Sequence, residues 1–383
     1  MSHSRILDCG GYPHPTPCAT IAIMLAHWSR RRPVPRRILV VLIALMAAGL
    51  LHAVLDFNSR SAAQQAAPGA RFNVGFQTRE FSYSLPDGSS KQLTLAIWYP
   101  TQAEPQQYRY RRELLTARVA VDAALYKPDT AYPLVLFSHG RGSCGTSSAY
   151  LTEHLAARGY IVAAPDHEDA FFCSIEDGEH VEWKRDSDDP FIVTYAHRVT
   201  DIRATLDEML RLNTDASSTF YQGIDEQRIA VAGHSLGGWT SEVLSGAIPG
   251  YRDERVTATL LLAPADDQFG PEEFQRIGVP VMHIVGEHEM FGRRTGETES
   301  FAYDQNRPPK FLAVVKNADH LAFSNFVCLG SRSVEGCQSL NPKAAVILKY
   351  AGAFMDFYLK NDDATVDTLG SGDPRLTAYY ASW

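Results

Sequence analysis

Two stretches near the start of the folded region alternate apolar and polar residues with a period of two. They are residues 73–84 (NVGFQTREFSYS) and 91–100 (KQLTLAIWYP), and the turn residues PDGSS lie between them. Alternation of this kind is typical of strands with one solvated face, and a short polar turn joins such strands as a hairpin. The pattern therefore predicts an antiparallel pair of strands.

From residue 133 onward, short continuous apolar runs alternate with longer segments of helical spacing. The apolar runs are typical of strands that are buried on both faces, so the order predicts a mostly parallel sheet covered by helices on both sides. We expect strands over 133–138, 160–165, 228–233, 255–264, 279–286 and 310–315, and helices over 147–159, 190–213, 235–247, 270–278 and 342–360.

Two segments interrupt this order. Residues 102–131 suggest an inserted, lid-like segment with a short helix and a basic patch, because connections between strands are usually brief. Residues 166–189 are rich in Asp and Glu without the spacing of an EF-hand, and we interpret them as a solvated acidic loop rather than a calcium site. Residues 62–383 are expected to form one catalytic domain, since no second linker is visible.

The first 61 residues have a different composition. A basic cluster at 30–37 precedes an uncharged apolar run over 38–51 and then small and polar residues, which is the pattern of a secretory signal. The run is short for a membrane helix, although residues 38–54 together leave an uncleaved anchor as the alternative. We therefore expect an exported protein, periplasmic or secreted. Met24 would give a signal of more usual length than Met1, so the start codon is open.

Charge limits the class of partner. The chain has 383 residues and a net charge of −8, and residues 1–66 hold seven arginines against two aspartates. The remaining 29 basic and 42 acidic side chains give the body a net charge of −13. An acidic body argues against nucleic acid or an anionic membrane as the partner.

Four of the six cysteines lie in the body, and an even number in an exported chain suggests two disulfides. Pairing Cys328 with Cys337 closes a loop of nine residues, which leaves Cys144 with Cys173. Four free thiols are the alternative.

The sequence GHSLG at 233–237 follows an expected strand and opens an expected helix. A serine on such a sharp turn projects from the end of the sheet, and small neighbours let strand and helix pass close to it. Ser235 is therefore the candidate nucleophile. His320 follows the last expected parallel strand and is the candidate base, with His139, His167 and His288 as competitors. We interpret His139 as a loop-shaping residue.

The third member of a triad is a carboxylate between the serine and the histidine. Glu289 is our first choice, because it follows a strand by three residues and precedes His320 by 31. Glu287, Asp266 and Asp267 are the alternatives. The glycine-rich loop FSHGRGSCG at 137–145 and the turn after the serine supply the expected oxyanion donors, the backbone N–H groups of Arg141 and Leu236.

These segments together resemble the α/β-hydrolase superfamily. The stretches at 73–101, YPLVLFSHGRG, LAARGYIVAAPDHED and GIDEQRIAVAGHSLGG look most like bacterial proteins that are similar to platelet-activating-factor acetylhydrolases and to predicted dienelactone hydrolases, which are related to cutinases and polyester hydrolases. The resemblance covers most of residues 73–360. It implies an eight-stranded sheet and ester hydrolysis without a metal or an organic cofactor.

The resemblance is looser at the acid. The acetylhydrolase pattern has an aspartate where this chain has Ala263, whereas the cutinase-like pattern has its acid where this chain has Glu289. Dienelactone hydrolases proper use a cysteine nucleophile where this chain has Ser235. The disulfide expected after the histidine resembles one in cutinase-like enzymes.

The expected function is a secreted serine esterase that acts on small-molecule, lipid or polymer esters with short or medium acyl chains. An acyltransferase or peptidase on the same triad is the second hypothesis, because the shape of the pocket selects the acceptor. A non-catalytic binding protein is the third. The oligomeric state is left open.

Overall fold

A computed structural model describes residues 72–85, 88–110, 115–170, 192–289 and 300–383, all within one compact unit, Gln65–Trp383. The expected hairpin is present as β1 (Asn73–Ser84) and β2 (Ser90–Thr101), which pair antiparallel along their whole length.

The central strands are those that the apolar runs predicted. They are β5 (Tyr132–Ser138), β6 (Ile161–Pro165), β7 (Ile224–His234), β8 (Val256–Leu262), β9 (Val281–Gly286) and β10 (Lys310–Val315). Strands β5 to β10 run parallel, and β2 joins them antiparallel through β6. The order β1-β2-β6-β5-β7-β8-β9-β10 is the eight-stranded core of the sheet.

The sheet is wider than expected, with 11 strands among the described residues. Strand β11 (Leu376–Ser382) adds antiparallel to β10 at one edge, and β4 (Thr116–Val121) and β3 (Gln106–Arg109) extend the other edge beyond β1. The short helix expected within 102–131 is therefore wrong for the described part of that segment, which forms β3 and β4, whereas the lid-like role of the insertion stays a prediction. Ala117 and Val119 are buried while Arg118 between them is exposed, a strand period that the helix-favouring composition concealed.

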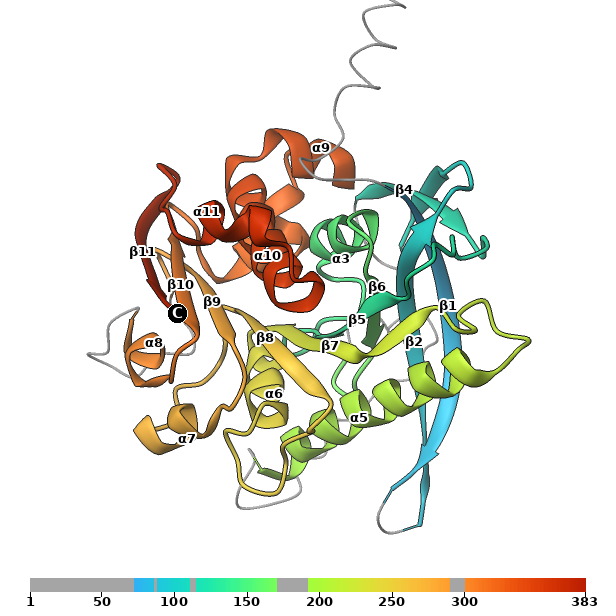
Figure 1. Cartoon of the computed structure of the whole chain (residues 1–383), viewed down its shortest axis with the longest axis horizontal. Helices are drawn as coiled ribbons and strands as arrows, with labels where there is room; N and C mark the ends of the chain where they lie inside the picture. Colours follow the sequence, from blue (N-terminus) through green and yellow to red (C-terminus); the bar gives the residue numbers. More distant parts are fainter. Residues whose placement is uncertain (1–71, 86–87, 111–114, 171–191, 290–299) are drawn as a thin grey trace, which may run out of the picture. The chain divides into compact units, whose positions relative to one another are not determined.

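Helices cover both faces of the sheet (Figure 1). The apolar side chains of α3 (Ala149–Ala157) and α10 (Pro342–Lys360) belong to the core on one face, and those of α5 (Ile192–Thr214), α6 (Leu236–Leu244) and α7 (Pro271–Arg276) belong to the core on the other. Strand β7 contributes to both cores, since Ala230 and Ala232 face one side and Ile229 and Val231 face the other.

The remaining elements are short and lie mostly in the last quarter of the chain. They are α8 (Phe301–Gln305), η2 (His320–Phe323), η3 (Asn325–Cys328), α9 (Val334–Leu340), η4 (Asp363–Thr365) and α11 (Val366–Leu369). Helix α10 has the predicted bounds because Pro342 fits its first turn and Asn341 caps it, accepting hydrogen bonds from the backbone of Lys343 and Ala344.

Of the residues described, none belongs to a helix that is both long and apolar enough to cross a membrane. The segment 38–54, where we expect the signal or anchor, lies outside the described residues. Residues 171–189 of the expected acidic loop also lie outside them.

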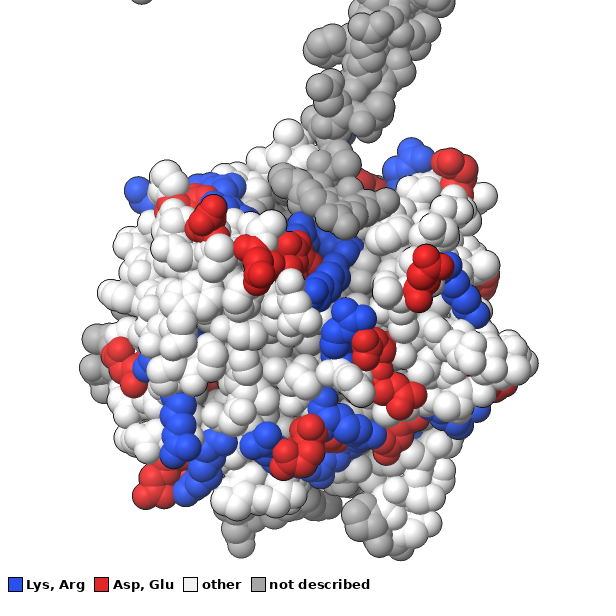
Figure 2. Space-filling view, in the orientation of Figure 1, with Lys and Arg blue, Asp and Glu red and all other residues white. Residues whose placement is uncertain are grey.

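Charged side chains of both signs lie next to one another on the face drawn in Figure 2. Surface side chains of opposite charge also form ion pairs, for example Arg255 with Asp207 and Arg276 with Glu272. That face has no broad region of a single charge of the kind that nucleic-acid-binding surfaces carry.

Candidate active site

Ser235 stands alone between the end of β7 and the start of α6, on the sharp turn that the motif predicted. Its backbone angles are φ 56° and ψ −120°, a conformation that side-chain-bearing residues rarely adopt. The strand and the helix on either side hold the serine in this strained geometry. The hydroxyl group thereby projects from the carboxyl end of the sheet.

The glycines of the motif have a steric reason that the structure makes explicit. A Cβ atom on Gly233 would collide with the carbonyl oxygen of Gly237, and one on Gly237 would collide with the carbonyl oxygen of Ser138. Both positions therefore exclude any side chain. The close approach of β7, α6 and β5 around Ser235 depends on them.

His320 and Glu289 reach Ser235 from two further loops. The Nε2 atom of His320 lies 2.8 Å from Oγ of Ser235, and Nδ1 of the same ring lies 2.8 Å from Oε2 of Glu289. The side chains of His320 and Glu289 are 11% and 3% exposed. The hydrogen on Nδ1 is donated to the carboxylate, so Nε2 is left as the nitrogen that accepts the serine proton.

The loops that carry the acid and the histidine are held together by backbone hydrogen bonds. The N–H of Glu287 donates to the carbonyl oxygen of Val315, and that of His288 donates to the carbonyl oxygen of Ala318. Asp319 caps the short helix η2 by accepting a hydrogen bond from Leu321. His320 therefore begins a fixed turn at the end of β10 rather than a long free loop.

The structure does not bring the alternative acids to the histidine. Oε2 of Glu287 accepts a hydrogen bond from the backbone of Asn317 at 2.7 Å, and Asp267 is exposed. Asp266 lies close to Glu242 and His283, a separate cluster. Of the four acids considered, Glu289 is the one whose carboxylate contacts His320.

His234, the residue before Ser235, forms a hydrogen bond to the backbone of His320. Its Nε2 atom donates a hydrogen bond to the carbonyl oxygen of His320 at 2.9 Å, and the two rings lie 4.8 Å apart. Burial first, and then the charge of His320, lowers the pKa of His234 to about 3. His234 is thus a neutral donor at physiological pH, a role that the sequence analysis did not assign.

The two expected oxyanion donors lie on segments that flank Ser235. Leu236 is the first residue of α6, where a backbone N–H has no acceptor within the helix. The loop containing Arg141 is adjacent, since a Cβ atom on Gly140 would lie 3.4 Å from Cβ of Ser235. The side chain of Arg141 is exposed, and the use of its backbone N–H as an oxyanion donor stays a prediction.

Arg198 of α5 fixes the conformation of that loop. Its guanidinium donates to the carbonyl oxygens of His139 at 2.7 Å and Gly140 at 3.4 Å, and it pairs with Asp169 at 2.8 Å. Asp169 in turn accepts a hydrogen bond from the N–H of Gly142 at 3.1 Å. We call Arg198 and Asp169 the loop clamp.

The loop clamp corrects one expectation from the sequence. Asp169 lies in the segment interpreted as a solvated acidic loop, yet it is 9% exposed and ion-paired. Arg198 is 2% exposed. Burial alone would raise the pKa of Asp169, but the charge of Arg198 outweighs it and holds that pKa well below its usual range. No local sequence signal links position 198 to position 140, so the clamp could not be predicted.

A second Ser–His–Asp arrangement lies in the interior of the protein. Oγ of Ser138 is 2.9 Å from Nε2 of His167, whose Nδ1 is 2.9 Å from Oδ2 of Asp201. Ser138, His167 and Asp201 are 1%, 3% and 0% exposed. A substrate has no access to a serine buried to this extent, so the arrangement is structural. His139 also donates from Nδ1 to the carbonyl of Gly140 and accepts the N–H of His167, which agrees with its interpretation as a loop-shaping residue.

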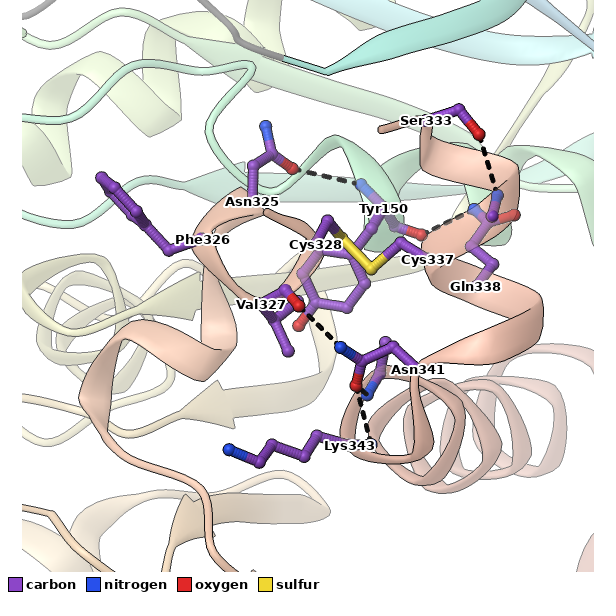
Figure 3. The surroundings of a disulfide bond; sticks show 12 residues. Tyr150, Asn325, Phe326, Val327, Cys328, Ser333, Cys337, Gln338, Asn341 and Lys343 are labelled. Carbon is purple, nitrogen blue, oxygen red and sulfur yellow. Dashed lines mark hydrogen bonds between the residues drawn. A yellow bond between two sulfur atoms is a disulfide. The ribbon is translucent and has the colours of Figure 1, made fainter. Parts of the chain in front are cut away.

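A disulfide between Cys328 and Cys337 joins η3 to α9, as expected, directly after the turn that carries His320 (Figure 3). Asn325 accepts a hydrogen bond from Tyr150 of α3, and Gln338 donates one to the carbonyl of Tyr150. Cys144 is also disulfide-bonded. Its predicted partner, Cys173, lies outside the described residues, so that pairing stays a prediction.

Direct hydrogen bonds connect the turn that carries His320, which we call the histidine turn, to the residues that follow the glycine-rich loop at 137–145. Oγ of Ser148 donates to the carbonyl of Phe323, and the backbone N–H of Asn325 donates to the carbonyl of Ser147. The disulfide-bonded segment and the start of α3 thereby form one support for His320.

Comparisons with known proteins agree with this architecture. A family model described as platelet-activating factor acetylhydrolase, isoform II, matches residues 109–203, and a PET hydrolase-like model matches residues 191–363. Among curated proteins, the platelet-activating factor acetylhydrolase of Cavia porcellus is 25% identical over 302 residues, which cover 69% of this chain and 67% of that enzyme.

Two further similarities have different extents. The platelet-activating factor acetylhydrolase of Gallus gallus is 26% identical over 238 residues, 53% of this chain and 55% of that protein. A solved structure, the ferulic acid esterase from Streptomyces cinnamoneus, superposes with a TM-score of 0.55 at 22% identity and covers 82% of this chain and 95% of its own. At that identity the likeness shows the fold.

The family resemblance seen in the sequence is thus confirmed, and so are the fold class and the reaction class that it implied. The chain is an α/β-hydrolase, a serine-type carboxylic-ester hydrolase related to platelet-activating factor acetylhydrolases and to PET hydrolase-like proteins.

Proposed function

We propose that Ser235, His320 and Glu289 carry out ester hydrolysis through an acyl-enzyme. The observation that supports this assignment is the continuous pair of 2.8 Å contacts from Glu289 through His320 to Ser235, with the serine on a strained turn. A nucleophile, a base and an orienting carboxylate in hydrogen-bonding order are the parts that serine acyl transfer requires.

In the first half of the reaction, Nε2 of His320 takes the proton of Ser235 as Oγ attacks the ester carbonyl carbon. The N–H groups of Leu236 and Arg141 stabilise the oxyanion. The C–O bond to the alcohol then breaks, and the alcohol leaves with the proton from His320. Glu289 stabilises the imidazolium throughout.

In the second half, water replaces the alcohol. His320 takes a proton from water as its oxygen attacks the acyl carbon, and the proton returns to Oγ of Ser235 as the acid is released. No external oxidant, reductant or co-substrate other than water is needed for the balance of these steps.

The surface beside His320 favours esters with an apolar acid portion. Three large apolar side chains on the turn that follows the histidine are unusually exposed, Leu321 at 49%, Phe326 at 58% and Leu329 at 53%. Exposed apolar patches at a functional site indicate a binding surface for apolar ligands. We therefore propose esters with short or medium acyl chains as the substrates, with lipid and polyester substrates as special cases.

Export of the protein is part of the proposal. The sequence of residues 30–61 and the Cys328–Cys337 disulfide support it, because disulfides persist in oxidising compartments. Detecting the enzyme in the periplasm or the medium, with N-terminal sequencing of the mature chain, tests both export and cleavage.

The first test is hydrolysis of a p-nitrophenyl ester series from acetate to dodecanoate by the full, oxidised chain. Ser235→Ala should lose at least a thousandfold in kcat, and a Leu321→Ser variant should lose more activity on long esters than on acetate. A fluorophosphonate probe should label the wild type and Ser138→Ala at Ser235, and should leave Ser235→Ala unlabelled.

Hydrolysis that survives in Ser235→Ala would contradict the assignment of the nucleophile. Labelling of Ser235 without turnover of any ester would keep the nucleophile but favour transfer to an acceptor other than water. Equal losses on all chain lengths in Leu321→Ser would contradict the apolar surface.

A further inference from the structure

Three side chains that the proposed reaction does not use lie close together, one of them on α6, the helix that follows Ser235. Glu242 lies on α6, Asp266 on the loop after β8, and His283 on β9. One possible ligand atom from each lies within 4.8 Å of the others. Their exposed fractions are 0%, 9% and 2%, so the cluster is almost completely removed from solvent.

Glu242 is the unusual member. Within the part of the chain that the structure describes, no group other than the neighbouring Asp266 carboxyl is placed to share a hydrogen bond with its carboxylate oxygens. Among the described residues, the charged group that shifts its pKa is the Asp266 carboxyl, with no lysine or arginine beside it. Burial first, and then the neighbouring Asp266 carboxyl, raises the pKa of Glu242 well above its usual range. An ionised carboxylate that is buried without hydrogen-bond donors destabilises the folded protein. A bound cation or a proton removes this destabilisation.

The orientation of His283 is fixed from behind. Its Nε2 atom lies 2.6 Å from Oδ1 of Asn306, and Nδ2 of Asn306 donates to the carbonyl oxygen of Phe274 at 3.0 Å. Because that bond orients the amide, Oδ1 faces the ring and the hydrogen of His283 is on Nε2. The lone pair on Nδ1 remains available as a ligand. A histidine whose second nitrogen donates to an outer carbonyl oxygen is the usual arrangement in metal sites.

We propose that Glu242, Asp266 and His283 form a binding site for one divalent transition-metal ion, for which zinc is the best match. Carboxylate oxygen and imidazole nitrogen are both ordinary zinc ligands, whereas calcium and magnesium prefer oxygen alone. Bonds of about 2.1 Å place tetrahedral ligands ~3.4 Å apart, so the site closes by modest rotations of the two acidic side chains.

The location gives the ion a structural role. Helix α6 begins directly after Ser235, and β9 ends three residues before Glu289. An ion bound to Glu242 and His283 would join the helix that carries the nucleophile to the strand that precedes the acid. It would contact none of the reacting atoms, so the proposal does not depend on the ester chemistry.

The chemical alternative is a proton shared between Glu242 and Asp266. Such an acid pair would also explain the raised pKa of Glu242 without any ion. The two arrangements differ in measurable ways, because a shared proton binds no metal and does not involve His283.

The experiment uses the full chain, freed of metal by dialysis against a chelator. Zinc, manganese and calcium chloride are titrated separately by calorimetry, and the midpoint of thermal unfolding is followed with each. We expect one saturable zinc site per chain, tighter than the manganese or calcium site by at least tenfold, and an increase in Tm that grows with free zinc.

Variants assign the site. Glu242→Gln and Asp266→Asn should each weaken zinc binding at least tenfold. Glu287→Gln, a surface acid outside the cluster, should bind like the wild type. His320→Ala should also retain the site, which excludes zinc on the triad histidine. X-ray absorption of the wild-type zinc complex should show one imidazole in an all nitrogen-and-oxygen shell, a result that holds even if a variant does not fold.

The proposal is overturned if the wild type binds no zinc in a saturable way. It is equally overturned if binding is unchanged in Glu242→Gln and Asp266→Asn, or if the absorption spectrum shows more than one imidazole. A Glu242→Gln variant that is more stable than the metal-free wild type, together with absent zinc binding, would establish the acid pair instead.

Discussion

His234 donates a hydrogen bond from Nε2 to the backbone carbonyl of His320 at 2.9 Å, so the residue next to the proposed nucleophile positions the proposed base. The contact spans 86 residues of sequence and fixes the backbone of the turn from which the catalytic ring projects. The second residue of the GHSLG motif therefore has a positioning role of its own.

We expect His234→Phe to lower kcat about fivefold with little change in KM. The variant keeps a buried ring but loses one hydrogen bond, which contributes about 1 kcal/mol. Steady-state kinetics on p-nitrophenyl butyrate measure the effect. A rate equal to that of the wild type would mean that the disulfide-bonded segment alone holds the histidine turn.

Substitutions at Glu289 test the acid. In Glu289→Asp the carboxylate withdraws by about one C–C bond of 1.5 Å, which breaks the 2.8 Å contact with His320 and should reduce kcat tens of times. Glu289→Gln should reduce kcat by about 10³ to 10⁴, the loss typical when an amide replaces a triad carboxylate.

The matched control is Glu287→Gln, which removes the nearby carboxylate that bonds to the backbone of Asn317. Its kcat should stay within about twofold of the wild type. If Glu289→Asp and Glu289→Gln both turned over at the wild-type rate, Glu289 would not belong to the triad.

The loop clamp should act on kcat. Arg198→Lys cannot reproduce the forked contacts to His139, Gly140 and Asp169, so the backbone at Arg141 should lose its fixed orientation. We expect a 10- to 100-fold decrease in kcat with KM within about threefold, somewhat less than the loss of a complete oxyanion donor.

Arg203→Lys is the control for the clamp, because Arg203 lies on the same helix but donates to the carbonyls of Tyr251 and Arg252. Asp169→Asn should resemble Arg198→Lys, and the double variant should be no worse than either single one. Additive losses would show that the two residues act separately.

His154 should make the protein sensitive to mild acid. Neither ring nitrogen has a partner among the described residues, and burial first, then the charge of Arg158, lowers the pKa of His154 to about 3. The unfolded chain takes up this proton below pH ~6.5, earlier than the folded protein does. Stability is therefore lost as the pH falls from about 6.5 toward 3, by up to about 1.4 kcal/mol per pH unit.

His154→Leu should remove that contribution. The free energy of unfolding of the variant, measured in urea, should therefore increase relative to that of the wild type as the pH falls from 7.5 to 5.5. His288→Leu, at an exposed position, should leave the pH dependence as it is. A constant difference between His154→Leu and the wild type at all three of pH 7.5, 6.5 and 5.5 would contradict the assignment.

Replacing Cys328 and Cys337 by serine should destabilise the protein by about 2.5 kcal/mol, the chain-entropy value for a loop of this length. Because the disulfide lies just after the histidine turn, kcat should also fall, and a reducing agent, which also breaks the disulfide of Cys144, should lower stability and kcat at least as much in the wild type. Unfolding in urea and esterase assays, each with and without reductant, measure them. An unchanged kcat would show that hydrogen bonds to Ser147 and Ser148 suffice to hold the turn.

The sequence predicted those features that depend on local pattern. Helix α10 begins and ends at the predicted residues because a proline, a capping asparagine and regular apolar spacing all agree there. The strand before Ser235 and the helix after it were predicted for a similar reason, since glycines at 233 and 237 leave room for the close approach of strand and helix around a sharp turn.

Features that depend on distant contacts could not be predicted. Residues 116–121 contain helix-favouring alanines, yet pairing with β1 and β3 makes them a strand, because tertiary contacts outweigh weak local preference. No sequence motif contains Arg198, His167 or Asp201. Their roles follow only from tertiary contacts between α5, the residues after β6 and the glycine-rich loop at 137–145.

The backbone of Ser235 has a consequence for evolution and for engineering. Glycine adopts a φ of 56° without strain, whereas serine does so only under constraint from β7 and α6. A Ser235→Gly variant should thus be inactive and yet more stable than Ser235→Ala. Selection for stability alone would remove the nucleophile, so retention of a serine in this conformation marks a position at which the chain gives up folding free energy for reactivity.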